Sequence, residues 1–174
     1  VALGWLCFGG AGHILYANKI DWTVRYAVLH DMTQASWPPG YDIGGSVLWF
    51  LRCPVGYYLP AALCGKIFGL VTADAFLYLW TAAGVAIFLS LLPIQSRSVG
   101  RMVLAFMVVV FFSGMDVLGW LTLWGFYPPL YKHLEWWAQL FQYSSNTTLL
   151  FWAPNHALPA WIAAALFWRH WKTD

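Results

Sequence analysis

Charged side chains are scarce in this sequence. Its 174 residues include only nine Lys or Arg and seven Asp or Glu, so 9% are charged, whereas 61% are hydrophobic. A soluble domain is about 25% charged, so this chain has too little polar surface to coat a water-soluble globule. Composition therefore predicts an integral membrane protein. The net charge of +2 is too small and too scattered to indicate a nucleic-acid partner.

Cysteine is also sparse, and several catalytic signatures are missing. Cys7, Cys53 and Cys64 lie in apolar stretches without a CxxC pair, which favours buried small hydrophobic side chains over a metal site. The sequence has no nucleophile elbow, no phosphate-binding glycine loop and no HExxH motif. Chemistry that depends on those signatures is disfavoured.

Long apolar runs are what the chain has in abundance. We expect an all-α fold, a polytopic transmembrane helix bundle with a short membrane-surface helix in its first extracytoplasmic loop. The chain is expected to form one membrane domain, 1–174, and to be a fragment of a longer protein. The expected segments are a partial first span (1–17), a surface loop and helix (18–45), a broken or re-entrant block (46–70), spans over 73–94, 102–124 and 148–168, and an extracytoplasmic loop (125–147).

Basic residues set the expected orientation. Arg97 and Arg101 join two spans, and Arg169 and Lys172 follow the last one. Short basic loops stay in the cytoplasm, so the loop over 125–147 is expected outside. The side of segment 18–45 stays open. It is cytoplasmic if block 46–70 crosses the membrane fully, and it is outside if that block is re-entrant.

A short helix is expected over 21–32, where Trp22, Tyr26 and Leu29 share one stripe. It carries the pair His30-Asp31. A carboxylate on a membrane-surface loop binds a metal, orients a polar acceptor or acts as a general base, and a neighbouring His shares those tasks. The alternative is a solvated polar face that ends in an Asp, and spacing alone favours it.

Three polar residues lie in runs that are expected to cross the membrane. Asp116 is near one end of the span over 102–124, and Asn155 and His156 stand between Pro154 and Pro159. An ionisable side chain inside a membrane is costly, which makes it a functional-site hypothesis. Asp116, Asn155 and His156 are expected to meet near the outer leaflet, either in a functional cavity or as a structural contact between helices.

The loop over 125–147 combines His133 and Glu135 with Trp136 and Trp137, and Gln142 follows. Aromatic rings beside hydrogen-bonding groups suit the recognition of a sugar or a lipid headgroup, but an aromatic belt at the membrane interface explains the same composition and is favoured. The polar run over 142–148 is either a helix cap or one wall of a binding site.

Several stretches resemble the GT-C superfamily of polytopic glycosyltransferases, which use lipid-phosphate-linked sugars. These stretches are His30-Asp31 followed by WPPGY (37–41), LRCPVGYYLPAALCGKIFG (51–69), HLEWW (133–137) and FQYSSNTTLLFWAPNHALPAW (141–161). The last two are similar to a group of bacterial multi-pass proteins of that type. The resemblance implies a protein of the bacterial inner membrane with its site on the extracytoplasmic side.

The resemblance also implies roles for individual residues. An essential acid lies in the first extracytoplasmic loop of such enzymes, and its match here is Asp31, with His30 beside it and Asp21 as a second choice. The pair allows a divalent metal but does not require one. Arg52 or Lys66 is expected to hold the donor phosphate. Glu135, Trp136 and Gln142 are expected to shape the sugar site, and Asp116, Asn155 and His156 to line its wall.

The function expected from the sequence is transfer of a sugar from a polyprenyl-phosphate-linked donor to an extracytoplasmic acceptor. The expected partners are membrane lipid, the lipid-linked donor and either a partner subunit or the remainder of a longer chain. One alternative is a transporter or channel fragment in which Asp116 and His156 form a polar relay. Another is a non-catalytic subunit of a membrane assembly.

Overall fold

A computed structural model describes residues 1–15, 21–45, 47–94, 98–112, 115–125 and 134–171. It is 70% helix with little strand, which confirms the all-α class. The chain divides into two units. Unit 1 comprises Val1–Leu92 and Phe151–Asp174, and unit 2 comprises Pro93–Leu150.

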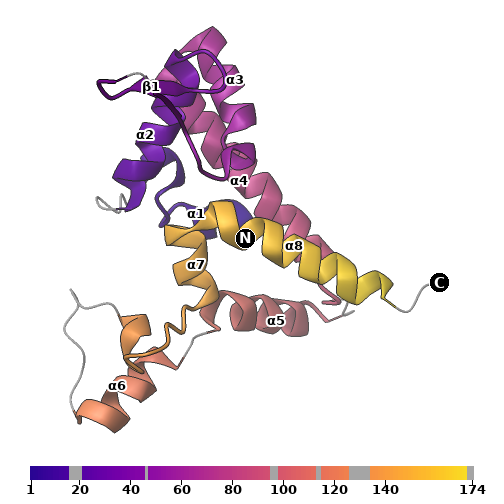
Figure 1. Ribbon diagram of the computed structural model, residues 1–174. Helices are drawn as coiled ribbons and strands as arrows, with labels where there is room; N and C mark the ends of the chain where they lie inside the picture. Colours follow the sequence, from indigo (N-terminus) through magenta and orange to yellow (C-terminus); the bar gives the residue numbers. More distant parts are fainter. Residues whose placement is uncertain (16–20, 46, 95–97, 113–114, 126–133, 172–174) are drawn as a thin grey trace. The chain divides into compact units, whose positions relative to one another are not determined.

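Unit 1 is built around one long helix (Figure 1). Its elements are α1 (Ala2–Leu6), the 3₁₀ helix η1 (Ala11–His13), α2 (Asp21–Gln34), strands β1 (Gly40–Asp42) and β2 (Leu48–Phe50), the 3₁₀ helix η2 (Val55–Tyr57), α3 (Leu59–Phe68), α4 (Leu70–Leu91) and α8 (Pro154–His170). Helix α4 contacts α1, α2, α3 and α8, so it forms the core of this unit.

Helix α4 covers nearly the same residues as the span expected over 73–94. Its side chains Ala73, Leu77 and Val85 are fully buried. Of the helices that the structure describes, it is the one that by itself is long and apolar enough to cross a membrane. Small side chains let its neighbours approach. A Cβ on Gly65 of α3 would lie 2.7 Å from the Ala73 Cβ and 2.9 Å from Thr33 of α2.

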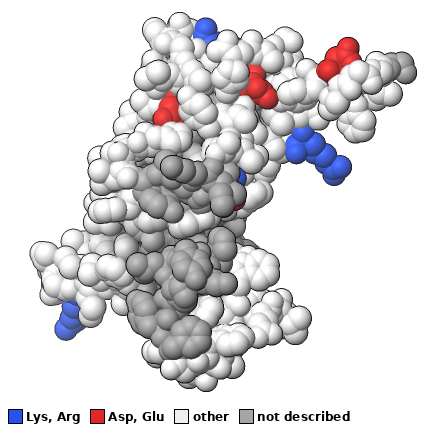
Figure 2. Space-filling view, turned by 90° about the vertical axis from the view of Figure 1, so that its left-hand side faces the viewer, with Lys and Arg blue, Asp and Glu red and all other residues white. Residues whose placement is uncertain are grey.

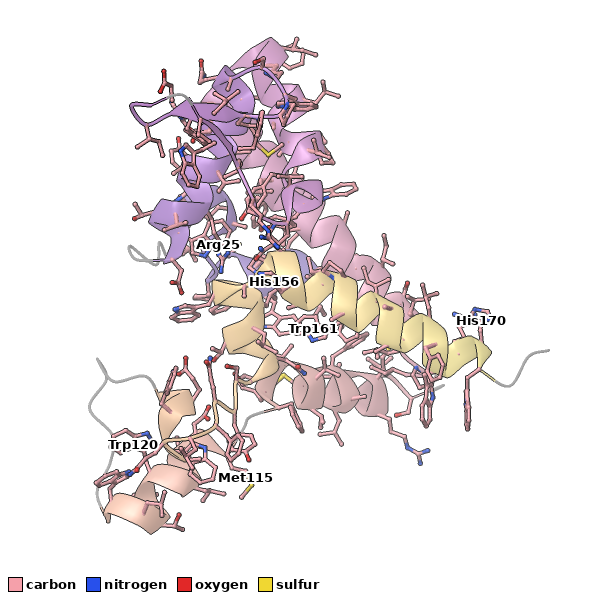
Figure 3. The ribbon with its side chains drawn as sticks, viewed as in Figure 1. Arg25, Met115, Trp120, His156, Trp161 and His170 are labelled. Carbon is pink, nitrogen blue, oxygen red and sulfur yellow. The ribbon has the colours of Figure 1, made fainter. Side chains whose placement is uncertain are left out.

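Aromatic packing joins α8 to the other end of α4. The Trp161 ring of α8 stacks on Trp5 of α1 at 6.2 Å and lies 5.1 Å from Phe88 of α4, and Figure 3 shows Trp161 midway along α8. Such offset ring pairs add to the stability gained from burial. In Figure 1, α8 runs beside the second half of α4.

The expected partial span over 1–17 differs from the structure. Helix α1 covers five residues, and η1 follows after a turn. Gly12 within η1 has a φ of +74°, a left-handed backbone angle that glycine adopts at little cost. Gly10 lies directly against the indole of Trp22 in α2. The first segment therefore folds back on α2 and α4 rather than continuing as a helix.

The expected span over 102–124 is divided in two. In unit 2, α5 (Val99–Phe111) ends because Phe112 has extended backbone angles, and α6 (Asp116–Trp124) begins after Met115, whose φ is +62°. A carboxylate in the first turn suits the positive end of the α6 dipole. The two helices are long and apolar enough to cross a membrane only when they are taken together as one bent span, with an angle of 51° between them.

The expected span over 148–168 is divided as well. Helix α7 (Asn146–Trp152) ends before Ala153, whose φ is −138°, and α8 starts at Pro154. Proline removes the preceding residue from helical geometry and suits the first position of the next helix. Pro159 lies inside α8. One helix, or two if α5 and α6 form one span, meets the membrane criteria among the described residues, so the polytopic bundle stays a prediction.

Candidate functional site

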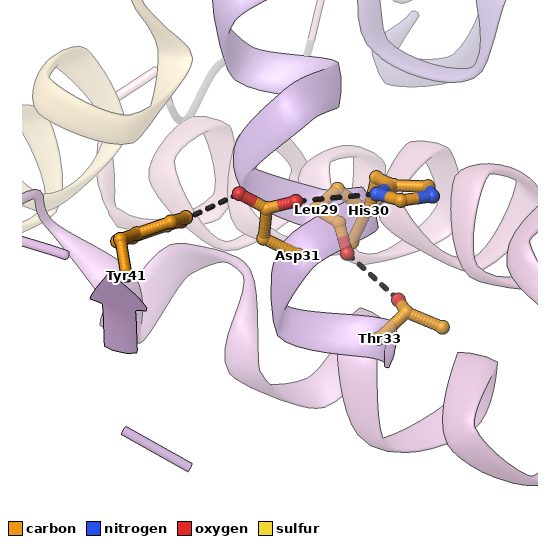
Figure 4. A network of polar contacts seen from close by, with 5 residues as sticks. All are labelled: Leu29, His30, Asp31, Thr33 and Tyr41. Carbon is orange, nitrogen blue, oxygen red and sulfur yellow. Dashed lines mark hydrogen bonds and ion pairs between the residues drawn. The ribbon is translucent and has the colours of Figure 1, made fainter. Parts of the chain in front are cut away.

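The side chain of Asp31 is held by two neighbours in unit 1 (Figure 4). The Tyr41 hydroxyl donates a hydrogen bond of 2.5 Å to Asp31 Oδ2, and His30 Nδ1 lies 3.2 Å from Asp31 Oδ1. Asp31 is in the last turn of α2 and keeps 34% of its side chain exposed. The carboxylate therefore has a fixed orientation and remains accessible to a ligand.

The strand pair brings Tyr41 back to α2. After α2 the chain reverses through Pro38 and Pro39, and β1 then pairs antiparallel with β2 so that Tyr41 faces Trp49. Sequence reasoning quoted Tyr41 within WPPGY but did not give it a role. The signal was present, because two prolines after a helix end it and turn the chain back.

The hydrogen bond to Asp31 raises the pKa of Tyr41 to about 12 from its ordinary value near 10, because the carboxylate favours the protonated phenol. Tyr41 therefore remains a hydrogen-bond donor at neutral pH. Since its pKa is raised in the folded state, the stabilisation it gives is complete below pH 10 and is lost as the pH rises towards 12.

This bond predicts a shifted phenol titration. Ultraviolet absorbance should show tyrosines that ionise near pH 12, and the Tyr41→Phe variant should show one fewer of them. In the Asp31→Asn variant Tyr41 should ionise at lower pH, because the negative charge is gone. Identical Tyr41 titrations with and without the Asp31 charge would contradict the contact.

A cation lies at the same end of α2. Lys66 of α3 donates from Nζ to the carbonyl oxygen of Ala35 at 2.5 Å, and it lies 5.3 Å from the centre of the Trp37 ring. The amide of Ala35 in turn bonds to the carbonyl of Asp31 at 2.8 Å. A cation suits the carbonyl groups at the carboxyl end of a helix. Lys66 and Asp31 therefore share one end of unit 1.

Arg52 follows β2, two residues after the hairpin, and its side chain is exposed. It forms no hydrogen bond or ion pair with any residue that the structure describes. Its guanidinium is thus available to an anion. Arg52, Lys66 and Asp31 all belong to unit 1, and their place in one site stays a prediction.

The remaining predicted residues fall into two groups. Glu135, Trp136, Gln142 and Asp116 belong to unit 2, so their place beside Asp31 stays a prediction. Within unit 2, Asp116 is buried at the start of α6, Trp136 is exposed in the 3₁₀ helix η3 (Leu134–Trp136), and Gln142 donates to Ser144 at 2.8 Å. His133 lies outside the described residues.

The polar run before α7 caps the helix, as one of its two interpretations predicted. Ser145 Oγ accepts a hydrogen bond from the Thr148 amide at 3.1 Å, the pattern of an N-terminal cap. Asn146 and Thr147 donate to the carbonyls of Val109 and Val110 in α5. This run therefore fastens α7 to α5 within unit 2.

Asn155 and His156 occupy the first turn of α8, but they differ in environment. Asn155 is buried, whereas His156 is exposed. Because Asp116 belongs to unit 2, the expected cluster of all three stays a prediction. Figure 3 shows Arg25 of α2 near this end of α8, and its Nε donates to the Trp152 carbonyl at 2.6 Å.

Sequence reasoning missed a second acid and histidine pair. His13 Nδ1 lies 2.9 Å from Oδ2 of Asp74, although 61 residues separate them. The signal was the charge of Asp74, which lies one turn inside a helix that is otherwise apolar. An acid at that depth calls for a partner.

The sequence allowed a divalent metal at His30 and Asp31, but the described residues offer few ligands for one. Among the residues that the structure describes, no group of three His, Cys, Asp or Glu side chains lies close enough to hold an ion. The potential ligand that contacts Asp31 is His30, whose Nδ1 lies 3.2 Å from Asp31 Oδ1.

Charge is also sparse on the surface. Figure 2 shows one face on which a few Lys, Arg, Asp and Glu side chains stand apart among uncharged residues.

Comparison with protein-family models, curated proteins and solved structures finds no match to this chain.

Proposed function

We propose that the chain is part of a GT-C-type glycosyltransferase of the bacterial inner membrane, which moves a sugar from a polyprenyl-phosphate donor to an extracytoplasmic acceptor. The observation that carries this proposal is the oriented, accessible carboxylate of Asp31 with a lysine at the same end of unit 1. A base and a cation are what such a transfer needs, one for the acceptor proton and one for the phosphate.

Exposed apolar side chains support the membrane location. On α4, Val71 is 84% exposed, and on α5 no side chain is buried while Phe111 is 69% exposed. Large apolar side chains gathered along helices at such exposure are costly in water. A lipid environment removes that cost, and it fits the hydropathy of α4.

The proposed reaction is a displacement at the anomeric carbon of the donor sugar. The acceptor hydroxyl oxygen forms the new bond to that carbon, and the bond from the carbon to the phosphate oxygen breaks. The acceptor proton passes to the Asp31 carboxylate, and polyprenyl phosphate leaves with the bonding electron pair. Tyr41 and His30 keep the carboxylate aligned for this proton transfer.

Two cations are assigned to the phosphate. Arg52 is exposed beside the strand pair and offers a planar fork of donors, which suits phosphate oxygens. Lys66 supplies a second positive charge near the carboxyl end of α2. These charges stabilise the leaving phosphate as the bond to the sugar breaks.

The test is a transfer assay in membranes that contain the protein. Polyprenyl-phosphate donors with radiolabelled glucose, mannose, galactose or arabinose are supplied one at a time, and release of polyprenyl phosphate is measured together with labelled product. We expect one donor to be consumed above the level of membranes that lack the protein. Consumption of none, with the protein correctly inserted, would contradict the proposal.

A further inference from the structure

Unit 1 contains a cavity of about 460 Å³ between α4, α8 and the segment around η2. Small-molecule sites in proteins range from roughly 300 to 1,000 Å³, so this volume suits a ligand rather than a few waters. Its lining residues include Pro54, Tyr57, Trp80, Asn155, Leu158 and Ile162. None of the cavity's lining residues is charged.

Asn155 contributes a buried amide to the lining of this cavity. Only 5% of Asn155 is exposed, and its Oδ1 atom is buried without a hydrogen bond to the residues that the structure describes. The hydroxyl of Tyr57, by contrast, is paired with Thr81 at 2.6 Å. A buried acceptor without a donor costs free energy, and a ligand that supplies the donor recovers it.

We propose that this cavity binds a neutral single-chain lipid, whose hydroxyl group donates a hydrogen bond to Asn155. The apolar walls from Leu158, Ile162 and Pro54 match an alkyl chain. The lining residues offer no counter-charge to an ionised headgroup, which favours a neutral one. A hydroxyl both donates and accepts, so it complements a side-chain amide.

Lipid is the expected source because α4, one wall of the cavity, is the candidate membrane span. The cavity also differs from the Asp31 site in its chemistry, since it lacks an acid and a cation among its lining residues. The inference therefore does not depend on sugar transfer. The Asp31→Asn variant should bind the same lipid as the unaltered protein does.

The test uses a matched pair of probes, dodecanol with a diazirine on its chain and the methyl ether of the same alcohol. The protein is placed in phosphatidylcholine nanodiscs and irradiated, and labelling is measured by mass spectrometry. The alcohol should label the cavity residues about tenfold more efficiently than the ether, which cannot donate to Asn155. Asn155→Leu should reduce alcohol labelling to the level of the ether.

A second variant fills the cavity without touching the buried core. Ala83 lines the cavity from an exposed position, so Ala83→Trp should abolish labelling by both probes. Ala86→Trp is the matched control, because Ala86 is exposed on the same helix but does not line the cavity. Equal labelling by alcohol and ether in the unaltered protein, or full labelling in Ala83→Trp, would overturn the proposal.

Discussion

Replacing Asp31 by Asn is expected to reduce sugar transfer by at least about 100-fold, because a positioned general base contributes a factor of this order or more. Asn has the same shape as Asp, and its Oδ1 still accepts the Tyr41 hydrogen bond, so the fold at the end of α2 is retained. The loss should appear in kcat, with the KM for the lipid-linked donor little changed.

The matched control is Asp42→Asn in the same strand pair. Asp42 is exposed, and its Oδ1 accepts a hydrogen bond from the Gly44 amide, which Asn also accepts. This variant removes the same charge a short distance along the chain and should keep full activity. If Asp31→Asn transfers sugar as fast as Asp42→Asn does, Asp31 is not the base.

Replacing Gly10 by Ala should strongly lower the free energy of unfolding. A Cβ at Gly10 would lie 1.9 Å from Nε1 of Trp22, which is 2% exposed and donates to the Phe151 carbonyl at 2.7 Å. Overpacking costs about 1–3 kcal/mol, and loss of the hydrogen bond adds about 1 kcal/mol. Unfolding of the purified protein by denaturant in detergent measures the change.

Gly4→Ala provides the comparison for that measurement. Gly4 lies inside α1, and a Cβ there meets no atom within 4 Å. Alanine should leave stability unchanged or raise it by about 0.5–1 kcal/mol, because it restricts the unfolded chain. Equal unfolding midpoints for Gly10→Ala and Gly4→Ala would show that Trp22 does not pack against Gly10.

The sequence predicted helices better than it predicted their breaks. The apolar run expected over 73–94 is α4 (Leu70–Leu91), and the helix expected over 21–32 is α2 (Asp21–Gln34). Hydropathy averages over many residues, so it misses a local change of backbone angles. The extended backbone at Phe112 and the irregular angles of Ala153 each end a helix inside a run that remains apolar.

The candidate site was predicted in part. Asp31, His30, Lys66 and Arg52 could be named from residue type, because charge is rare in this chain and each charge stands out. The partner Tyr41 depends on the reversal at Pro38 and Pro39 and on strand pairing. Contacts between distant residues, such as His13 with Asp74 and Trp22 with Phe151, depend on tertiary packing that no local pattern encodes.

We propose that the Asp31 site faces the extracytoplasmic side, where a lipid-linked sugar is available. The most direct test is labelling of single cysteines by a membrane-impermeant maleimide in intact spheroplasts, after Cys7, Cys53 and Cys64 are replaced by Ala. Ser36, exposed just after α2, reports on the site. Ser98, beside the basic residue Arg101, reports on the expected cytoplasmic side.

We expect the Ser36→Cys variant to be labelled in intact spheroplasts and the Ser98→Cys variant to be labelled only after lysis. Protection of Ser36→Cys until lysis would place the carboxylate of Asp31 on the cytoplasmic side and contradict the glycosyltransferase assignment.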